Sequence, residues 1–373
     1  MNVILLSIPL FFVLIAVEVI ADWRLKRGYY RLNDTVNDLS MGILYEVAKL
    51  FLAIIPLAIY AWIYRHARVW TVPGTVWGWA LAFVLWDFFY YWSHRAMHEV
   101  NFLWATHAPH HQSEEYNLSV ALRQGVFQPF FSCFFYWPMA VVGVPVEMYL
   151  LVAGLNLIYQ FWIHTRFIRS LGPLEYVFNS PSHHRVHHGK NPRYLDRNHA
   201  GVFIVWDRLF GTFQREDEEP VYGTVEPLAS WNPAWGQVKY AAWLAQAGWS
   251  SPDRLDLVRV WFKPPGWLPA GLTIEGPAIG DPFPPRYDPP VPRGVVVRAV
   301  AEFVVVLALA LGLLLFAPKL TALAQAVLSL HVFFGLVAVG ALLEQKPWVR
   351  WFDPLRAVLL ILTLALGWAF ARS

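Results

Sequence analysis

Long apolar runs alternate with short polar segments over the first part of the chain. Residues 3–21 carry a single charge, Glu18, and are numerous enough to cross about 30 Å of hydrocarbon as a helix. Residues 44–64 and 76–92 form two further apolar runs. The pattern therefore predicts three transmembrane helices in residues 1–92.

The next apolar stretch is interrupted by residues that break helices. Residues 126–144 and 145–163 are apolar, but three prolines and a glycine divide them. A helical hairpin, with a re-entrant path as one form of it, fits this pattern better than two straight spans. Further along, the apolar runs 295–317, 320–343 and 357–371 predict three C-terminal membrane helices.

Between these apolar groups the chain becomes polar. Residues 166–293 contain Pro- and Gly-rich stretches, which indicate ordered coil around short helices. The expected fold class is an all-α integral membrane protein whose transmembrane helices carry a helical, histidine-rich cap. We expect N-terminal membrane helices in residues 1–92, a catalytic region in 93–293 that includes the hairpin at about 126–163, and C-terminal membrane helices in 294–373.

The composition supports a membrane protein and excludes several other classes. Charged residues make up 15% of the chain, whereas a soluble domain has about 25%. The net charge of +3 is too small to indicate a nucleic acid partner. The one cysteine, Cys133, cannot form an internal disulfide, and it leaves no thiolate site of the zinc-ribbon or iron–sulfur type.

The positions of the basic residues predict the orientation. Cytoplasmic loops of membrane proteins carry an excess of Lys and Arg. Arg24, Lys26 and Arg27 follow the first apolar run, and Arg293 and Lys346 flank the C-terminal runs on the same predicted side. The cap is therefore expected in the cytoplasm. The abundance of Ala, Val, Trp and Arg over Lys favours a bacterial inner membrane over the endoplasmic reticulum.

Histidines are concentrated in one part of the chain. Eleven of the thirteen lie between residues 94 and 199. His94 and His98 are four positions apart, so they share one face of a helix that continues the third apolar run. Two clusters with the pattern HxxHH follow, and each places three histidines on one helical face: His107, His110 and His111, then His184, His187 and His188.

These eight imidazoles predict two metal ions. A zinc ion takes four ligands, so eight nitrogens exceed the need of one ion. The spacing does not choose between iron, copper, zinc and nickel, all of which bind imidazole. No Glu-x-x-His pair occurs among these histidines, which excludes a ferritin-like carboxylate site. The HExxH pattern of a zinc protease is also absent.

The histidines lie in stretches that resemble the fatty acid hydroxylase/sterol desaturase superfamily, and within it the alkylglycerol monooxygenase group. The stretches that carry the resemblance are HRAMHEVN at residues 94–101, WATH followed by HH at 104–111, SPSHHRVHHG at 180–189 and WDRLFGTF at 206–213. The resemblance extends from about residue 30 to about residue 265.

The resemblance implies a membrane-bound di-iron monooxygenase that uses O2 to hydroxylate a lipid. The implied position of attack is the carbon next to the ether oxygen of an alkylglycerol, which leads to an aldehyde and a glycerol derivative. Tetrahydrobiopterin is the implied electron donor. The eight box histidines are implied as iron ligands, and His164 matches a further histidine and is implied as the ninth.

Two acids near the first histidine pair are candidates for supporting roles. Glu99 follows that pair directly and is predicted to hydrogen-bond the pterin or a ligand imidazole; the plainer alternative is a solvated glutamate at a helix end. Asp87 lies within a predicted span, where an acid is a functional hypothesis by default. We expect it to orient a ligand imidazole or to pair with Arg95 or Arg123. Weaker candidates for the orienting task are Asn117, Asn198 and Asp207.

Two alternatives remain open at this point. The same histidine boxes would serve a hydroxylase or desaturase of another lipid, such as a sterol, a fatty acyl chain or an aminolipid. A metal transporter is a distant alternative. It would place polar residues near the membrane midplane and show inverted repeats, whereas here the histidine boxes lie at the ends of the apolar runs and no repeat is visible. The expected partners are a lipid, O2 and the bilayer, and the sequence indicates no oligomeric state.

Overall fold

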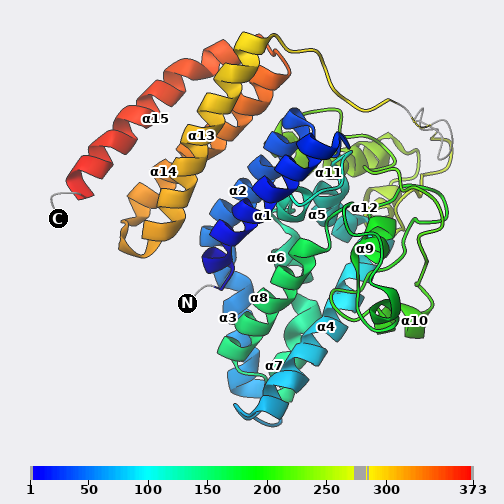
Figure 1. The fold of residues 1–373 in the computed structure, drawn as a ribbon. Helices are drawn as coiled ribbons and strands as arrows, with labels where there is room; N and C mark the ends of the chain where they lie inside the picture. The colour runs from blue at the N-terminus through cyan, green and yellow to red at the C-terminus, as the bar shows by residue number, and fades with distance from the viewer. Residues whose placement is uncertain (1–2, 273–282, 284, 371–373) are drawn as a thin grey trace.

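The protein is built almost entirely of helices (Figure 1). The computed structural model describes residues 3–272, 283 and 285–370. Within these residues there is no strand, and bridge pairing is limited to Phe178 with Phe203 and Gly189 with Tyr222. The prediction of an all-α fold is confirmed.

Three helices among the described residues are long and apolar enough to cross a membrane. They are α1 (Val3–Leu25), α13 (Arg293–Phe316) and α14 (Ala322–Leu343). They match three of the predicted apolar runs, which confirms that the chain has several candidate membrane helices. The next helix, α15 (Val349–Phe370), contains the predicted run 357–371 except for its last residue, which lies outside the described residues.

The predicted span at residues 44–64 is interrupted in the structure. This region forms α2 (Leu32–Leu52) and α3 (Ile54–Ala67), which are bent by 50° and count together as one broken span at most. Pro56 explains the break, because a proline removes a backbone hydrogen bond and its ring clashes with the carbonyl four residues earlier. That carbonyl belongs to Leu52, the last residue of α2.

The helix that carries the first histidine pair is continuous. Helix α4 (Val76–Glu99) begins after Thr75, whose hydroxyl accepts a hydrogen bond from the Gly78 N–H at 3.2 Å. It extends beyond the predicted run 76–92 and so includes His94 and His98. It is not among the helices identified as spans by length and hydropathy, since it is rich in Trp and Tyr. That α4 crosses the membrane stays a prediction.

The apolar stretch after the second histidine box forms a helical hairpin, as its prolines and glycine indicate. One arm consists of short segments, and the other is the straight helix α8 (Val146–Trp162). The turn between them needs Gly143, which has φ 103°, and a Cβ there would lie 2.0 Å from the Trp70 carbonyl oxygen. The short segments are α6 (Gln128–Ser132), η2 (Cys133–Tyr136) and α7 (Trp137–Val142).

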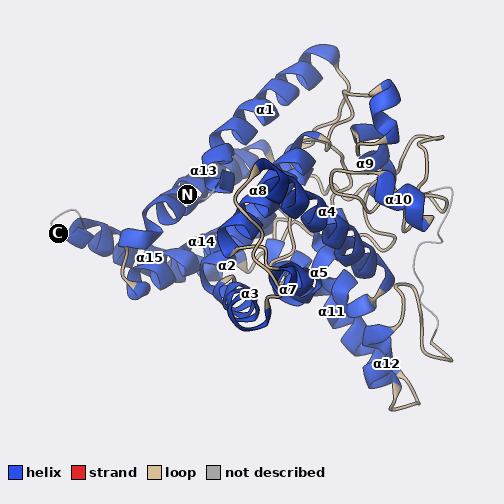
Figure 2. Ribbon diagram, turned by 90° about the horizontal axis from the view of Figure 1, so that it is seen from below, coloured by secondary structure: helices blue, strands red, loops and turns tan. Residues whose placement is uncertain are grey.

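A cap of short helices and loops covers one end of the long helices (Figures 1 and 2). Its main element is α5 (Asn101–His111), which follows α4 after a break at Val100. The polar segment contributes loops and short helices, as predicted, and also one helix of 18 residues, which is longer than predicted. These helices are η3 (Gly172–Tyr176), α9 (Pro181–His187), α10 (Val205–Phe210), α11 (Pro233–Ser250) and α12 (Asp256–Phe262).

The C-terminal helices pack against α2 on the flank opposite α9 and α10 (Figure 2). Apolar residues of α13 and α14, such as Phe303 and Leu336, bury against Val36 and Val47 of α2. Gly335 permits close packing, since a Cβ there would lie 2.5 Å from Val306. The C-terminal helices are therefore part of one packed body with α2.

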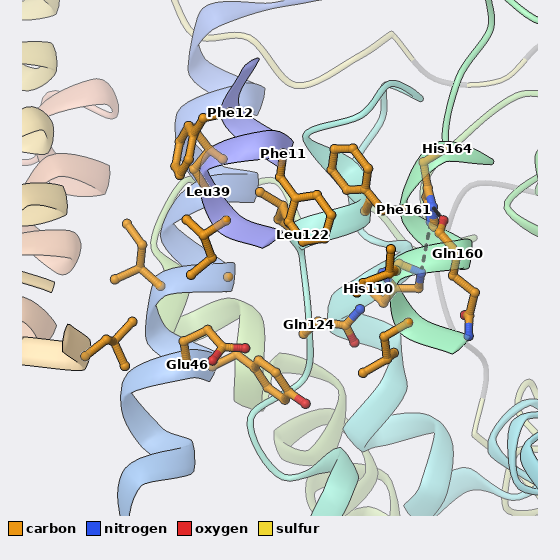
Figure 3. Close-up of a pocket in the computed structure, with 18 of the residues that line it drawn as sticks. Phe11, Phe12, Leu39, Glu46, His110, Leu122, Gln124, Gln160, Phe161 and His164 are labelled. Atoms are coloured by element: carbon orange, nitrogen blue, oxygen red, sulfur yellow. Dashed lines mark hydrogen bonds between the residues drawn. The ribbon is translucent and has the colours of Figure 1, made fainter. Parts of the chain in front are cut away.

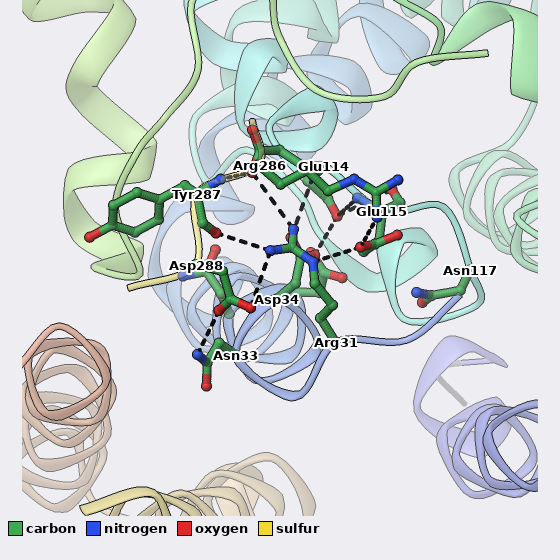
Figure 4. Close-up of polar contacts among 12 residues, drawn as sticks. Arg31, Asn33, Asp34, Glu114, Glu115, Asn117, Arg286, Tyr287 and Asp288 are labelled. Carbon is green, nitrogen blue, oxygen red and sulfur yellow. Dashed lines mark hydrogen bonds and ion pairs between the residues drawn. The ribbon is translucent and has the colours of Figure 1, made fainter. Parts of the chain in front are cut away.

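A charged network fastens the segment before α13 to the start of α2 (Figure 4). Arg31 lies 2.6 Å from Glu115 and 3.3 Å from Asp34, and it donates a hydrogen bond to the Tyr287 carbonyl at 3.0 Å. Arg286 binds the same Glu115 carboxylate at 2.6 Å. Because Glu115 is buried, the two guanidinium groups compensate a charge that would be costly alone.

Candidate metal centre

The cap brings nine histidines together in two groups. We call them the five-histidine group (His94, His98, His107, His111 and His187) and the four-histidine group (His110, His164, His184 and His188). In each group, one ring nitrogen of every member lies within 4.8 Å of those of the other members, and all nine residues are buried. These are the nine histidines that the boxes and the resemblance single out.

Four pieces of backbone place these side chains. Helix α4 presents His94 and His98, and α5 presents the second box, with its histidines divided between the two groups. His164 comes from the turn just after α8. The third box lies on α9, whose start is specified by Ser180, since its hydroxyl accepts a hydrogen bond from the His183 N–H, and by Pro181 in the first turn.

The inner ring nitrogens have the arrangement that a cation needs. The Nε2 atoms of His94 and His107 lie 2.9 Å apart in the five-histidine group, and those of His110 and His164 lie 3.4 Å apart in the other. In all four rings Nδ1 lies against an oxygen acceptor and so carries the hydrogen, which leaves a bare lone pair on Nε2. Lone pairs that face each other repel, and a cation between them removes that repulsion.

Further ring nitrogens are buried without any hydrogen-bond partner. They include Nε2 of His98, His187 and His188. A buried polar atom without a partner costs about 1–3 kcal/mol, and native structures contain few of them. Their position inside the histidine groups indicates that metal ions complete the site. Five and four imidazoles suit two such ions.

Outer hydrogen bonds hold the rings in place. Four Nδ1 atoms donate to backbone carbonyls, which belong to His199, Arg123, Gln160 and Arg197, at 2.7–3.0 Å. The fifth is that of His107, which bonds the side-chain oxygen of Gln128 at 2.9 Å. Such partners set the tautomer and the orientation of metal-binding histidines.

The electrostatic state of the rings favours metal binding. Burial lowers the pKa of His107 and His164 to about 4. It also holds the pKa of the other histidines on α5 and in the third box well below the usual value of 6.5. Since only a neutral imidazole can coordinate a metal, these rings are ready ligands at neutral pH.

Asp87 forms no hydrogen bond with any of the nine imidazoles, so the prediction that it orients a ligand imidazole directly is wrong. The alternative prediction, an ion pair with Arg95 or Arg123, is also wrong. Its buried carboxylate accepts hydrogen bonds from the Val202 and Phe203 N–H groups and from the Trp206 indole at 2.7–3.0 Å. A fourth comes from Asn156 at 2.7 Å. Asp87 thus anchors the 202–206 loop to α4 and α8.

Asp207 supports a ligand through the backbone. It accepts hydrogen bonds from the His199 and Ala200 N–H groups, both at 2.8 Å. The His199 carbonyl in turn accepts from His94 Nδ1 at 2.8 Å. His199 itself is outside both histidine groups.

The remaining candidates lie away from the imidazoles. Glu99 is half exposed at the end of α4 and pairs with Arg95 at 2.8 Å, which is the plainer of its two predicted roles. The amide of Asn117 bonds the Tyr29 carbonyl, and that of Asn198 bonds the His183 carbonyl. Neither asparagine side chain holds a ligand ring, which corrects that expectation.

Sequence reasoning missed Gln128 and the role of Arg123. Gln128 lies at the start of the hairpin, where nothing in its neighbourhood marks it as a histidine partner. The Arg123 guanidinium is fully buried and binds Asn37, Asp38 and the Pro109 carbonyl, which ties α2 to the second box. The signal that marks Arg123 is its burial next to the second histidine box, and burial cannot be read from the sequence.

An apolar cavity of about 150 Å³ reaches both groups from the side of the long helices (Figure 3). We call it the helix-side pocket. His107, His110 and His164 form its inner end, and the amides of Gln124 and Gln128 lie beside them. Its other walls are mainly apolar side chains of α1, α2, α8 and α13, with the carboxylate of Glu46 on α2 among them. The apolar residues include Phe11, Phe12, Leu39, Phe161, Leu311 and Leu314. Its shape and chemistry suit a hydrocarbon chain that ends next to the metals.

Comparisons with known proteins agree with this geometry. Residues 79–212 match the family model described as fatty acid hydroxylase. An alkylglycerol monooxygenase of Homo sapiens is 39% identical over 368 residues, which is 96% of this chain and 82% of that protein. The Xenopus tropicalis alkylglycerol monooxygenase is 38% identical over 94% of this chain and 79% of its own. An ornithine lipid hydroxylase of Rhizobium tropici is 28% identical over 36% of this chain and 40% of its own. No solved structure matches.

Proposed function

The chain belongs to the alkylglycerol monooxygenase family, and from this premise we propose that it hydroxylates the ether-adjacent carbon of an alkylglycerol with O2. At the coarser level it is a lipid-acting membrane monooxygenase, an oxidoreductase with a histidine-rich metal site. The observation that carries the proposal is the helix-side pocket, which connects apolar membrane helices to both histidine groups.

We propose that the two groups hold two iron ions. The five-histidine group would hold one and the four-histidine group the other, with all nine histidines as ligands. When bound, the ions supply the activation of O2 and the oxidation of a C–H bond. The surrounding protein keeps the imidazoles neutral through burial, orients them through the outer hydrogen bonds, and excludes water from the reacting carbon.

The helix-side pocket positions the substrate. The alkyl chain would lie among the side chains of α1, α2 and α13, and the ether oxygen would lie at the inner end near His107, His110 and His164. Gln124 has a side-chain amide at that end, where it can bond a glycerol hydroxyl. A chain held in this way presents the ether-adjacent carbon, and no other methylene, to the metals.

The overall reaction balances with a two-electron donor. One oxygen atom of O2 enters the C–H bond, and the other leaves as water with two electrons and two protons from the donor. The hemiacetal then collapses to an aldehyde and a free glycerol hydroxyl. We propose tetrahydrobiopterin as the donor, on the basis of the family resemblance.

We also propose that the histidine groups face the cytoplasm, in a bacterial inner membrane. The end of α1 and the start of α13 both lie in the upper part of Figure 1, and Arg24 and Arg293 stand at these two helix ends, which supports a cytoplasmic position for that side. A cysteine placed at the exposed Asp253 of the cap, in a Cys133→Ser background, should react with an impermeant maleimide only after the membrane is opened. Reaction in intact cells would reverse the orientation.

Turnover of detergent-purified protein tests the proposed function. We expect aldehyde from 1-O-alkylglycerol only when both O2 and tetrahydrobiopterin are present, with about two irons per chain in the same sample. The acyl analogue, which has an ester in place of the ether, is the matched control and should give no aldehyde. Two irons with hydroxylation of a sterol, acyl chain or aminolipid would replace the substrate, whereas zinc alone would overturn the mechanism.

A further inference from the structure

A second cavity reaches the histidine groups from the loops of the cap. Its volume is about 410 Å³, well above the 150 Å³ of the helix-side pocket. We call it the loop-side cavity. His98, His111 and His187 of the five-histidine group line it, together with His188 of the four-histidine group. The two cavities share no lining residue, so each approaches the groups through different imidazoles.

The walls of the loop-side cavity combine aromatic, charged and aliphatic side chains. They come from α4, α5, α9, α11 and the loops around residues 189–196, 223–228 and 265–266, and none comes from α1, α2 or α13. The cavity is therefore open to a ligand from the aqueous side, not to one that arrives through the membrane helices. Its charged residues are Lys190, Asp196, Glu226 and Lys239.

Aromatic rings connect the wall of this cavity to the ligand imidazoles. The Trp104 ring centroid lies 4.9 Å from that of His98 and 5.3 Å from that of His111. Tyr240 follows at 6.3 Å from Trp104, and Trp243 lies 5.4 Å from Tyr240. The Tyr240 hydroxyl donates to Asn101 at 2.7 Å, which holds this ring in place. Such a wall favours a flat aromatic ligand, since rings stack with a gain of about 0.5–1.5 kcal/mol beyond burial.

Polar groups suited to a nitrogen heterocycle stand around these rings. The Asp196 carboxylate lies 3.6 Å from His98 Nδ1, and its backbone is held at φ 56°, a conformation that non-glycine residues seldom adopt. Glu226 and Lys239 form an ion pair at 3.0 Å across the opposite rim. Carboxylates accept hydrogen bonds from ring N–H and amino groups. Glu99, which the sequence predicts to hydrogen-bond the pterin or a ligand imidazole, is not among the lining residues.

We propose that the loop-side cavity binds the electron donor, a reduced, planar nitrogen heterocycle of the pterin class, while the lipid occupies the helix-side pocket. This rests on the proposed function, in which two electrons must reach the metals from a soluble donor. The donor would lie against Trp104 and Trp243, within reach of Asp196 and Glu226. Lipid and donor then meet the same histidine groups from two separate cavities and do not exclude each other.

The first test is a competition experiment on the unmodified, iron-loaded protein. Anaerobic titration with tetrahydrobiopterin, followed by quenching of tryptophan fluorescence and by calorimetry, gives its Kd. We expect that Kd to change by less than about twofold when a saturating alkylglycerol is present. A Kd that rises in proportion to the lipid concentration would place both ligands in one pocket and overturn the proposal, and so would a failure of the pterin to bind.

Variants locate the binding. Trp243→Leu and Glu226→Gln should each raise the pterin Kd at least about tenfold, while the KM for the lipid stays the same. Trp235→Leu is the matched control, because Trp235 lies on the same helix α11, is 41% exposed and does not line the cavity. Iron content reports folding in every variant. Unchanged pterin binding in both cavity variants, with iron retained, would overturn the assignment.

The outcomes separate this inference from the proposed function. If no lipid ether is cleaved but pterin still binds and Trp243→Leu weakens it, the substrate is wrong and the cavity assignment holds. If ethers are cleaved with pterin but the cavity variants bind it normally, the function holds and this assignment fails.

Discussion

The helix-side pocket and the loop-side cavity approach the same two histidine groups between different elements and with different side chains. The first is smaller and is walled mainly by apolar side chains of α1, α2, α8 and α13, with Glu46 of α2 as its one carboxylate and glutamine amides beside the histidines. The second is wider and is walled by tryptophans, a tyrosine and charged residues on α5, α11 and loops. The difference follows from their locations, since one opens among candidate membrane helices and the other within the cap.

This comparison suggests a division of labour. On the proposed function, the lipid would enter between the long helices and the water-soluble donor between the loops of the cap. Both histidine groups line both cavities, the helix-side pocket through His107, His110 and His164 and the loop-side cavity through His98, His111, His187 and His188. Substitutions can test whether the histidine groups, the helix-side pocket and the loop-side cavity act separately.

The largest effect is expected from removing one of the nine histidines. His184→Ala should reduce the iron content from about two to about one per chain and abolish turnover, because it belongs to the four-histidine group. His94→Ala should do the same from the other group. Atomic absorption measures the iron content of both variants, and aldehyde release measures their turnover. The control is His331→Gln, since His331 lies on α14, bonds Thr363 at 3.0 Å and is outside the groups. Full iron in His184→Ala would contradict the assignment.

A smaller effect is expected from loosening one ligand without removing it. Gln128→Leu deletes the hydrogen bond to His107 Nδ1, and losses of such partners typically weaken metal affinity by about 10–100-fold. Chelator competition measures the affinity. Gln128→Glu keeps an acceptor at that position and should recover most of the affinity. Equal iron affinities of the Gln128→Leu and Gln128→Glu variants would show that the hydrogen bond to His107 does not determine metal affinity.

The helix-side pocket can be narrowed from the C-terminal helices. Leu311→Trp on α13 places a large ring in its wall, so we expect the KM for long-chain alkylglycerols to rise several-fold and that for short-chain ones to rise less. Leu315→Trp is the control, because Leu315 is 59% exposed on the same helix and does not line the pocket. The pterin Kd should be unaffected by either change. An equal effect for all chain lengths would argue against this path for the tail.

The smallest effect is expected at Glu99. Its pair with Arg95 is at the surface, and such pairs contribute about 0–1 kcal/mol. Glu99→Gln should therefore leave iron content and lipid KM unchanged and shift the pterin KM by less than about twofold. A clear rise in pterin KM alone would support the role that the sequence suggests for Glu99, and would extend the donor site beyond the loop-side cavity.

Patterns along the chain predicted much of the architecture, and their failures have clear causes. The runs that became α1, α13 and α14 were recognisable because an apolar stretch of that length has few alternatives to a membrane helix. The bend between α2 and α3 was missed because Pro56 lies inside an apolar run, where its effect on the Leu52 carbonyl is easily overlooked. The hairpin was anticipated because its prolines and Gly143 are closely spaced.

Asp87 shows where such reasoning stops. An acid on the face of His94 suggests a direct contact, yet its partners are the Val202 and Phe203 N–H groups, more than a hundred residues away in the chain. The spacing of Asp87 and His94 along the helix can be read from the local sequence. The loop that lies beside Asp87 cannot, because it comes from a distant part of the chain. The same holds for Gln128, which meets His107 only because the hairpin folds back on α5.

The sequence by itself determined which imidazoles could act together on one helix, since positions three and four apart share a face whatever the rest of the chain does. It also determined that the chain has apolar membrane helices. Only the tertiary structure decided how the second box is divided, with His107 and His111 in one group and His110 in the other. It alone placed one cavity among helices and another among loops, because both are enclosed by segments far apart in the chain.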